Sequence, residues 1–278
     1  MTYRDILIQV DASPASRSRV GTAAALARRS EAQLTGVFLK SEFLRNYMTG
    51  EAAVYTATDV LDLLVKEHLA AVASAADEAR EMFESAAGDA GIVSRWLTID
   101  GDDGEALSAT ARRFDLTVIP PEMAASLGWR RIMAADIGLS CGGPVLVLPE
   151  AEAAPTVAER VLVAWKGTRE SARALHDAWP LIAAAKEVHV LVVAPEGEGG
   201  PEGLLQRHFE RHGCKPNLIV DRSHDASAGE ILRRQVTTLG ADLVVMGLYG
   251  RPRLQELVLG GVSRDMLGAP PAPLFLSH

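Results

Sequence analysis

The chain has 278 residues, which is enough for about two domains. Hydrophobic residues make up 48% of it and charged residues 23%, as in a typical globular protein, while the net charge of −8 argues against nucleic-acid binding. Two cysteines are too few for a disulfide framework, and neither a membrane-spanning run nor a signal peptide is recognisable. We therefore expect a cytoplasmic protein with no membrane or nucleic-acid partner.

The first half of the chain alternates apolar strand patterns with helical patterns. Residues 5–10 predict a strand, and Ser13 and Pro14 favour the start of an Ala-rich helix that runs to about Arg29. The pattern continues with a strand at 33–39, an insert at 41–57 and a long helix at 58–88. A strand at 93–99, a helix from Gly104, and strands at 114–119 and 144–148 complete this half.

The second half repeats this order. Asp11 and Lys166 are 155 residues apart, and each directly follows the first predicted strand of its half. In chain order, the repeated elements are a strand at 160–165, a helix to about Ala185, strands at 187–193 and 217–220, a helix from Gly229, and strands at 241–246 and 273–277. Such an internal repeat is stronger evidence for the fold than any single motif.

Alternating strands and helices predict an α/β protein in which helices cover both faces of a parallel sheet. We expect two doubly wound, Rossmann-like domains in tandem, at residues 1–150 (the first half) and 156–278 (the second half). The closing strands, at about 144–149 and 273–277, are candidates for an intramolecular contact that makes a pseudo-dimer. Whether the chain also forms a homodimer stays open.

A glycine pattern marks the end of the fourth strand of the second half. Gly247 and Gly250 follow an apolar run, and Gly260, Gly261 and Ser263 come after nine further residues. Glycines let the backbone approach a ligand closely, and free N–H groups at a helix start favour a phosphate. The pattern indicates a nucleotide site, although glycines also serve as plain turns.

With this pattern and the repeat, the whole chain resembles a tandem universal stress protein. Nucleotide-binding members of that family carry Gly, two residues, Gly, nine residues, then Gly followed by Ser or Thr. The resemblance implies an ATP or other adenine-nucleotide site in the second half alone, with backbone N–H groups on the phosphates, a hydroxyl from Ser263, and Val193 near the adenine. The implied cofactor-binding residues are Ala164, Lys166, Gly167, Thr168, Val193, Gly247, Gly250, Gly260, Gly261, Val262 and Ser263.

Two positions of the second half depart from the family pattern. Gly261 stands where the family has Ser or Thr, and Lys166 stands where it has an acidic residue. The lysine could attract a phosphate, or its stem could fill the pocket. A metal-assisted arrangement is disfavoured, and we assign no metal ligand.

The first half departs in the opposite sense. It keeps Asp11 and Ser13, but Pro120 and Met123 replace Gly247 and Gly250. Proline has no N–H to donate, and methionine occupies the space that a phosphate needs. We expect no nucleotide there.

His208 and His212 are four residues apart on a predicted helix, a spacing compatible with metal binding. No His-Glu-x-x-His motif surrounds them, and we expect a solvated helix face. No general base or metal ligand stands beside the glycine pattern, so no catalytic residue is assigned. The resemblance implies a non-catalytic stress-response or sensor protein; the alternatives are a slow ATPase or autophosphorylating enzyme and a nucleotide-free interaction module.

Overall fold

The computed structural model describes residues 2–41, 58–101, 104–126, 131–149, 157–193, 202–223, 226–248 and 261–278. Its strands in the first half are β1 (Asp5–Gln9), β2 (Gln33–Lys40), β3 (Ser94–Asp100), β4 (Leu116–Ile119), β5 (Glu122–Ala124), β6 (Arg131–Met133) and β7 (Val145–Val147). Its helices there are α1 (Pro14–Ser30), α3 (Thr58–Ala90), α4 (Glu105–Ala111) and α5 (Ala134–Ser140).

The second half has the strands β8 (Arg160–Trp165), β9 (Glu187–Val193), β10 (Asn217–Asp221), β11 (Leu243–Gly247) and β12 (Leu274–Ser277). Its helices are α6 (Arg169–Asp177), α7 (Trp179–Ala184), α8 (Glu202–Arg211), α9 (Ala228–Leu239) and α11 (Val262–Gly268). The expected helix to about Ala185 is thus two helices, because Pro180 lies in the first turn of α7 and supplies no N–H to continue α6.

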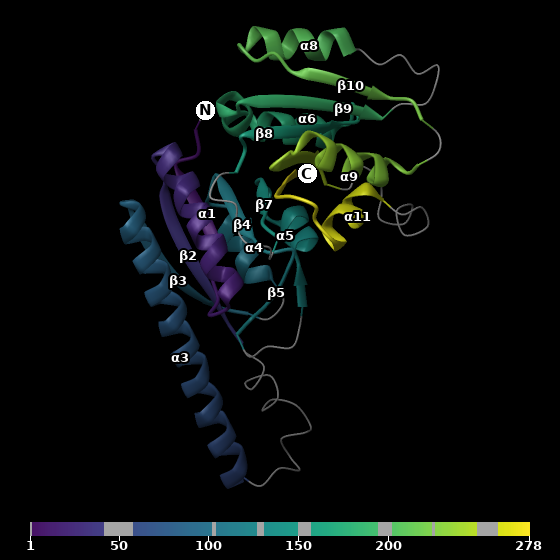
Figure 1. Ribbon diagram of the computed structural model, residues 1–278. Helices are drawn as coiled ribbons and strands as arrows, with labels where there is room; N and C mark the ends of the chain where they lie inside the picture. Colours follow the sequence, from purple (N-terminus) through teal and green to yellow (C-terminus); the bar gives the residue numbers. More distant parts are fainter. Residues whose placement is uncertain are drawn as a thin grey trace.

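One ten-stranded sheet joins the two halves in the order β10-β9-β8-β11-β12-β7-β4-β1-β2-β3 (Figure 1). Within this sheet all strand pairs of each half are parallel, whereas β12 and β7 pair antiparallel, with Phe275 opposite Leu146. The contact expected between the closing strands is therefore present. In each half the winding direction reverses between the first and fourth strands, which are neighbours.

Apolar residues cover both faces of the sheet. Ile6 and Ile8 belong to one buried cluster and Leu7 to the other, as alternating side chains of a strand must. Each cluster contains residues of both halves, including Phe275 in the first and Leu276 in the second. The core therefore runs across the junction without a break.

Polar contacts also cross between the halves. The Tyr3 hydroxyl donates to the backbone carbonyl of Asp177 at 2.7 Å, and the Arg29 guanidinium donates to the carbonyl of Val157 at 3.0 Å. Gly138 of α5 leaves room for Leu248, because a Cβ at 138 would lie 2.6 Å from a Leu248 methyl carbon.

The helix α3 extends well past the strands beside it (Figure 1). Its C-terminal part packs through Ala79, Phe83 and Ala87, whereas Leu63, Leu64 and Leu69 are largely exposed. The insert expected at 41–57 lies, beyond residue 41, outside the described residues. Among the described residues, no helix is both long and apolar enough to cross a bilayer.

Candidate functional site

The candidate site of the second half lies at the carboxyl ends of β8, β9 and β11. Open α/β sheets bind ligands at this edge, where the winding direction reverses. Ala164 near the end of β8 and Val193 at the end of β9 are half-buried, and Val262 at the start of α11 packs with them against the same apolar cluster. Three of the expected residues therefore lie on one face of the sheet.

The turn between β8 and α6 carries three more of the expected residues. Lys166 and Gly167 are exposed, so the lysine stem does not fill a buried pocket. Gly167 has φ +71°, a left-handed conformation that favours glycine. Thr168 caps α6: its hydroxyl accepts from the Ser171 amide, and the Ser171 hydroxyl accepts from the Thr168 amide. This reciprocal cap fixes where α6 begins.

Gly247 has a packing role that the sequence pattern did not reveal. A Cβ at this position would lie 2.6 Å from the carbonyl carbon of Glu170 and 2.7 Å from the amide nitrogen of Ser171. These are backbone atoms of the first turn of α6, so they cannot move aside cheaply. Glycine at 247 therefore lets the start of α6 lie directly against the end of β11.

The remaining expected residues are at the start of α11. Gly261 is its N-cap and makes no side-chain capping bond, Val262 is its first residue, and Ser263 is buried. Gly250 and Gly260 lie outside the described residues, so the part of the pattern between Leu248 and Gly261 stays a prediction.

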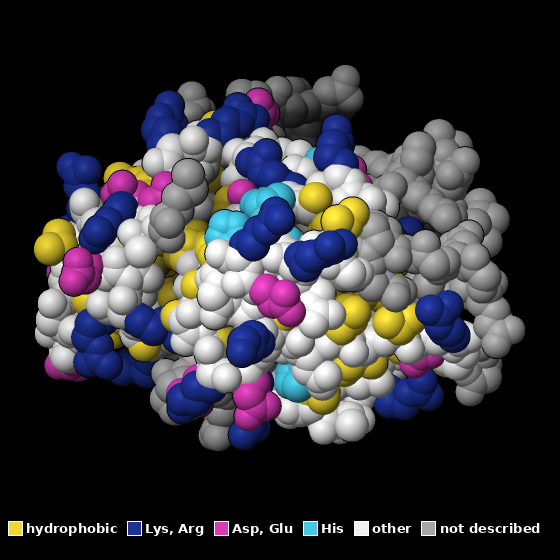
Figure 2. Space-filling view, turned by 90° about the horizontal axis from the view of Figure 1, so that it is seen from above, with side chains coloured by type: hydrophobic (Ala, Val, Ile, Leu, Met, Phe, Trp, Pro, Cys, Tyr) yellow, Lys and Arg dark blue, Asp and Glu magenta, His cyan; other side chains and the backbone are white. Residues whose placement is uncertain are grey.

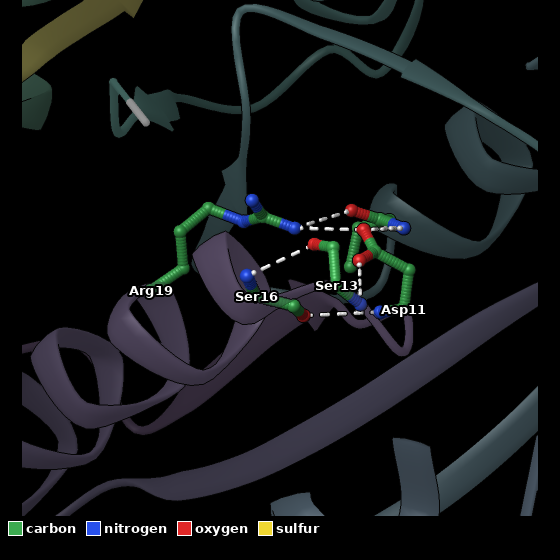
Figure 3. A network of polar contacts seen from close by, with 5 residues as sticks. Asp11, Ser13, Ser16 and Arg19 are labelled. Atoms are coloured by element: carbon green, nitrogen blue, oxygen red, sulfur yellow. Dashed lines mark hydrogen bonds and ion pairs between the residues drawn. The ribbon is translucent and has the colours of Figure 1, made fainter. Parts of the chain in front are cut away.

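The equivalent turn of the first half holds an internal network of polar contacts (Figure 3). The Arg19 side chain, only 3% exposed, lies 2.9 Å from the Asp11 carboxylate, and Gln9 contacts both groups. The Asp11 carboxylate also accepts from the Ser13 amide at 2.8 Å. Burial alone would raise the pKa of Asp11, but the Ser13 hydrogen bonds and the Arg19 charge outweigh it and lower that pKa.

Beyond β4, the first half forms a two-stranded ribbon of β5 and β6. Its inward residues Met123 and Ile132 are buried, and Ile132 lies so close to Gly104 that a Cβ there would be 2.8 Å from an Ile132 methyl carbon. The Ala134 amide donates to the Pro121 carbonyl at 3.0 Å, which ties the ribbon to its start. The sequence did not predict this ribbon. It buries Met123, the residue that stands in the sequence where the second half has Gly250.

No protein-family model and no curated protein sequence matches this chain. Solved structures do. A universal stress protein from Archaeoglobus fulgidus has a TM-score of 0.71 at 15% identity, covering 98% of this chain and 97% of that one. A functionally unknown protein from Pseudomonas aeruginosa has a TM-score of 0.59 at 16% identity, covering 99% and 92%.

The chain has the universal stress protein fold. Both coverages are nearly complete, so the similarity extends over both halves and the tandem arrangement.

Glu170 lies at the candidate site, and the sequence analysis did not single it out. It is buried at the second position of α6, next to Gly247. A hydrogen bond from its own backbone amide is the main cause that lowers the pKa of Glu170, and burial opposes it; Thr168 and the Arg169 guanidinium, 3.2 Å away, add to the lowering. The available signal was the first turn of a capped helix, where carboxylates are favoured.

The 155-residue offset makes the two halves directly comparable. Lys166 replaces Asp11, Glu170 replaces Ala15, and Ala174 replaces Arg19. At the position equivalent to Arg19, the second half thus has the methyl group of an alanine in place of a buried guanidinium. Among the described residues, no group of three His, Cys, Asp or Glu side chains is arranged to hold a metal ion.

Proposed function

We propose that the protein is a non-catalytic, tandem universal stress protein that senses an adenine nucleotide through its second half, with residues 1–150 and 156–278 as its domains. One observation carries the proposal: the two halves share a fold but differ in the residues near the carboxyl ends of their first and fourth strands. The first half has Arg19, Met123 and Ile132 there, all buried. The second half has Ala174 in place of Arg19 and glycines at 247 and 261.

Lys166 supports a phosphate-bearing ligand. It is exposed at the carboxyl end of β8, where a ligand of this fold would lie, and its charge is opposite to that of Asp11. A lysine about 4 Å from a phosphate contributes roughly 1–4 kcal/mol, depending on the effective dielectric. The resemblance to the nucleotide-binding members supplies the adenine part of the proposal.

The test is a titration of the full-length protein with ATP, followed by thermal unfolding. A ligand at 100 times its Kd stabilises a protein by about 2.7 kcal/mol, which raises the Tm by several degrees. Gly250→Met should abolish the shift, whereas Met123→Gly, the same exchange reversed in the first half, should leave it. The absence of any shift at millimolar ATP would contradict the proposal and favour the interaction module, whereas turnover abolished by Gly250→Met would favour the enzyme.

A further inference from the structure

Three histidines of the second half form a cluster with Trp179, outside the candidate nucleotide site. The ring centres of His208 and His212 are 4.8 Å apart, and those of His208 and His176 are 5.5 Å apart. Trp179 lies 4.7 Å from His212 and 5.9 Å from His208. The cluster therefore connects α6, the first residue of α7, α8 and the residue that follows α8.

The expectation of a solvated helix face was wrong for His208. Its ring is half-buried, and its Nε2 atom is inaccessible to solvent and has no hydrogen-bond partner among the described residues. Burial, followed by the charges of His212, His176 and Arg211, lowers the pKa of His208. The packed arrangement thus favours the neutral imidazole of His208.

The charged groups around the cluster would not compensate for added protons. On α6, the Asp177 carboxylate already accepts from Arg173 at 2.8 Å and from the Ser277 hydroxyl at 2.6 Å. On α8, Glu210 accepts from Gln206 at 3.0 Å, while Arg207 and Arg211 are cationic. The helix α7 has no ionisable residue. Protonated histidines would therefore meet mainly like charges.

The space-filling view in Figure 2 also shows basic side chains around the histidines. Figure 2 views the molecule from above Figure 1, the side on which α8 lies, and shows neighbouring histidine side chains with several Lys and Arg side chains around them. The His176 Nδ1 atom lies 2.8 Å from the Ala172 carbonyl, which holds that ring along α6.

The helix α8 lies at an edge of the molecule, beside the edge strand β10 (Figure 1). Its inward residues Leu205 and Phe209 are buried and belong to the apolar core, whereas Leu204 is 62% exposed. An edge helix can open at a smaller cost than the central strands. Opening would expose Leu205 and Phe209.

We propose that the contact of α8 with α6 and Trp179 is an acid-sensitive latch. At neutral pH the uncharged His208 ring packs against His176, His212 and Trp179, and α8 stays closed. Protonation of His208 places a further cation beside Arg211, α8 separates from α6, and the apolar surface beneath it becomes available. The latch is independent of the proposed nucleotide site.

Amide hydrogen exchange of the full-length protein tests the latch. Protection factors are compared at about pH 7.5 and about pH 5.5, on either side of the ordinary histidine pKa of ~6.5. Protection in α8 should fall by about tenfold or more, whereas β8 and β11 should keep theirs. Unchanged protection in α8, or a simultaneous loss throughout the sheet, would overturn the proposal.

Variants assign the effect to the histidines. The triple variant His176→Gln, His208→Gln and His212→Gln should keep α8 protected at the lower pH, and His278→Gln, a histidine outside the cluster, should behave as the unaltered protein. If the triple variant leaves α8 open at both pH values, Arg211→Gln serves instead: removing a neighbouring cation should shift the opening to lower pH, and an unshifted opening contradicts the latch. A pH effect that disappears with EDTA would point to a bound metal and overturn it.

Discussion

The guanidinium of Arg19 lies 2.9 Å from the carboxylate of Asp11, and 3% of the arginine side chain is exposed against 32% of the aspartate side chain. Removing one partner of a fully buried ion pair costs about 3–5 kcal/mol. Because Asp11 is partly solvated and Gln9 also contacts Arg19, we expect Asp11→Ala to destabilise the protein by roughly 2 kcal/mol. Urea denaturation measures this cost.

A double-mutant cycle separates the pair from its surroundings. Arg19→Met keeps the apolar stem of the side chain and removes its charge. The double variant Asp11→Ala with Arg19→Met should recover more than half of the stability lost in Asp11→Ala, because no charge is then left buried. Additive losses would show that the two groups stabilise the fold separately.

The same carboxylate predicts a pH dependence. The pKa of Asp11 is lower in the folded protein than its ordinary 3.8. Its contribution to stability is therefore fully present above that value and is lost as the pH falls through 3.8 towards the folded-state pKa. We expect Asp11→Asn to flatten the fall in stability between about pH 5 and pH 3. Chemical denaturation across this range checks the slope, which an unimportant carboxylate would leave unchanged.

Glycine 247 should tolerate no side chain. Its Cβ would meet backbone atoms of Glu170 and Ser171, so we expect Gly247→Ala to cost roughly 2–3 kcal/mol. Gly88 in α3 is the matched control, since a Cβ there meets nothing within 4 Å. Gly88→Ala should stabilise the protein by up to about 1 kcal/mol. Thermal unfolding distinguishes the two, and equal effects would refute the packing role of Gly247.

Lys166 should act on a bound nucleotide by its charge. An exposed lysine beside a phosphate contributes about 1 kcal/mol, so Lys166→Ala should weaken ATP binding about fivefold at low salt and less at high salt. Lys186→Ala removes the same charge at the opposite end of the strands and should leave the affinity unchanged. Calorimetric titration measures both variants; tighter binding by Lys166→Ala would mean that the side chain obstructs the site.

The strands were predictable because a parallel sheet buries both of its faces. Runs such as Leu243–Met246 are apolar throughout, and the repeat offset identified their counterparts. The β5–β6 ribbon was not predictable, since its strands of three residues are too short for a periodic pattern. Proline at 180 was a visible signal for the break between α6 and α7, but the helical pattern on both sides concealed it.

The candidate site was predictable only where residue type determines the chemistry. Gly167 and Thr168 were predicted from turn and capping preferences, and they lie in the turn and at the N-cap before α6. Arg19 was not, because an arginine within an Ala-rich helix looks like a surface residue until its buried partner is known. The histidine cluster was half visible: the spacing links His208 to His212, but His176 joins them from another helix.

The antiparallel contact of β12 with β7 has a consequence for how the sequences of the two halves can diverge in evolution. Because both strands belong to one polypeptide, each half meets its counterpart at every protein concentration. The halves therefore need not remain identical in order to recognise each other. One half can bury side chains such as Arg19 and Met123 near the carboxyl ends of its strands and still serve as the permanent support of the other.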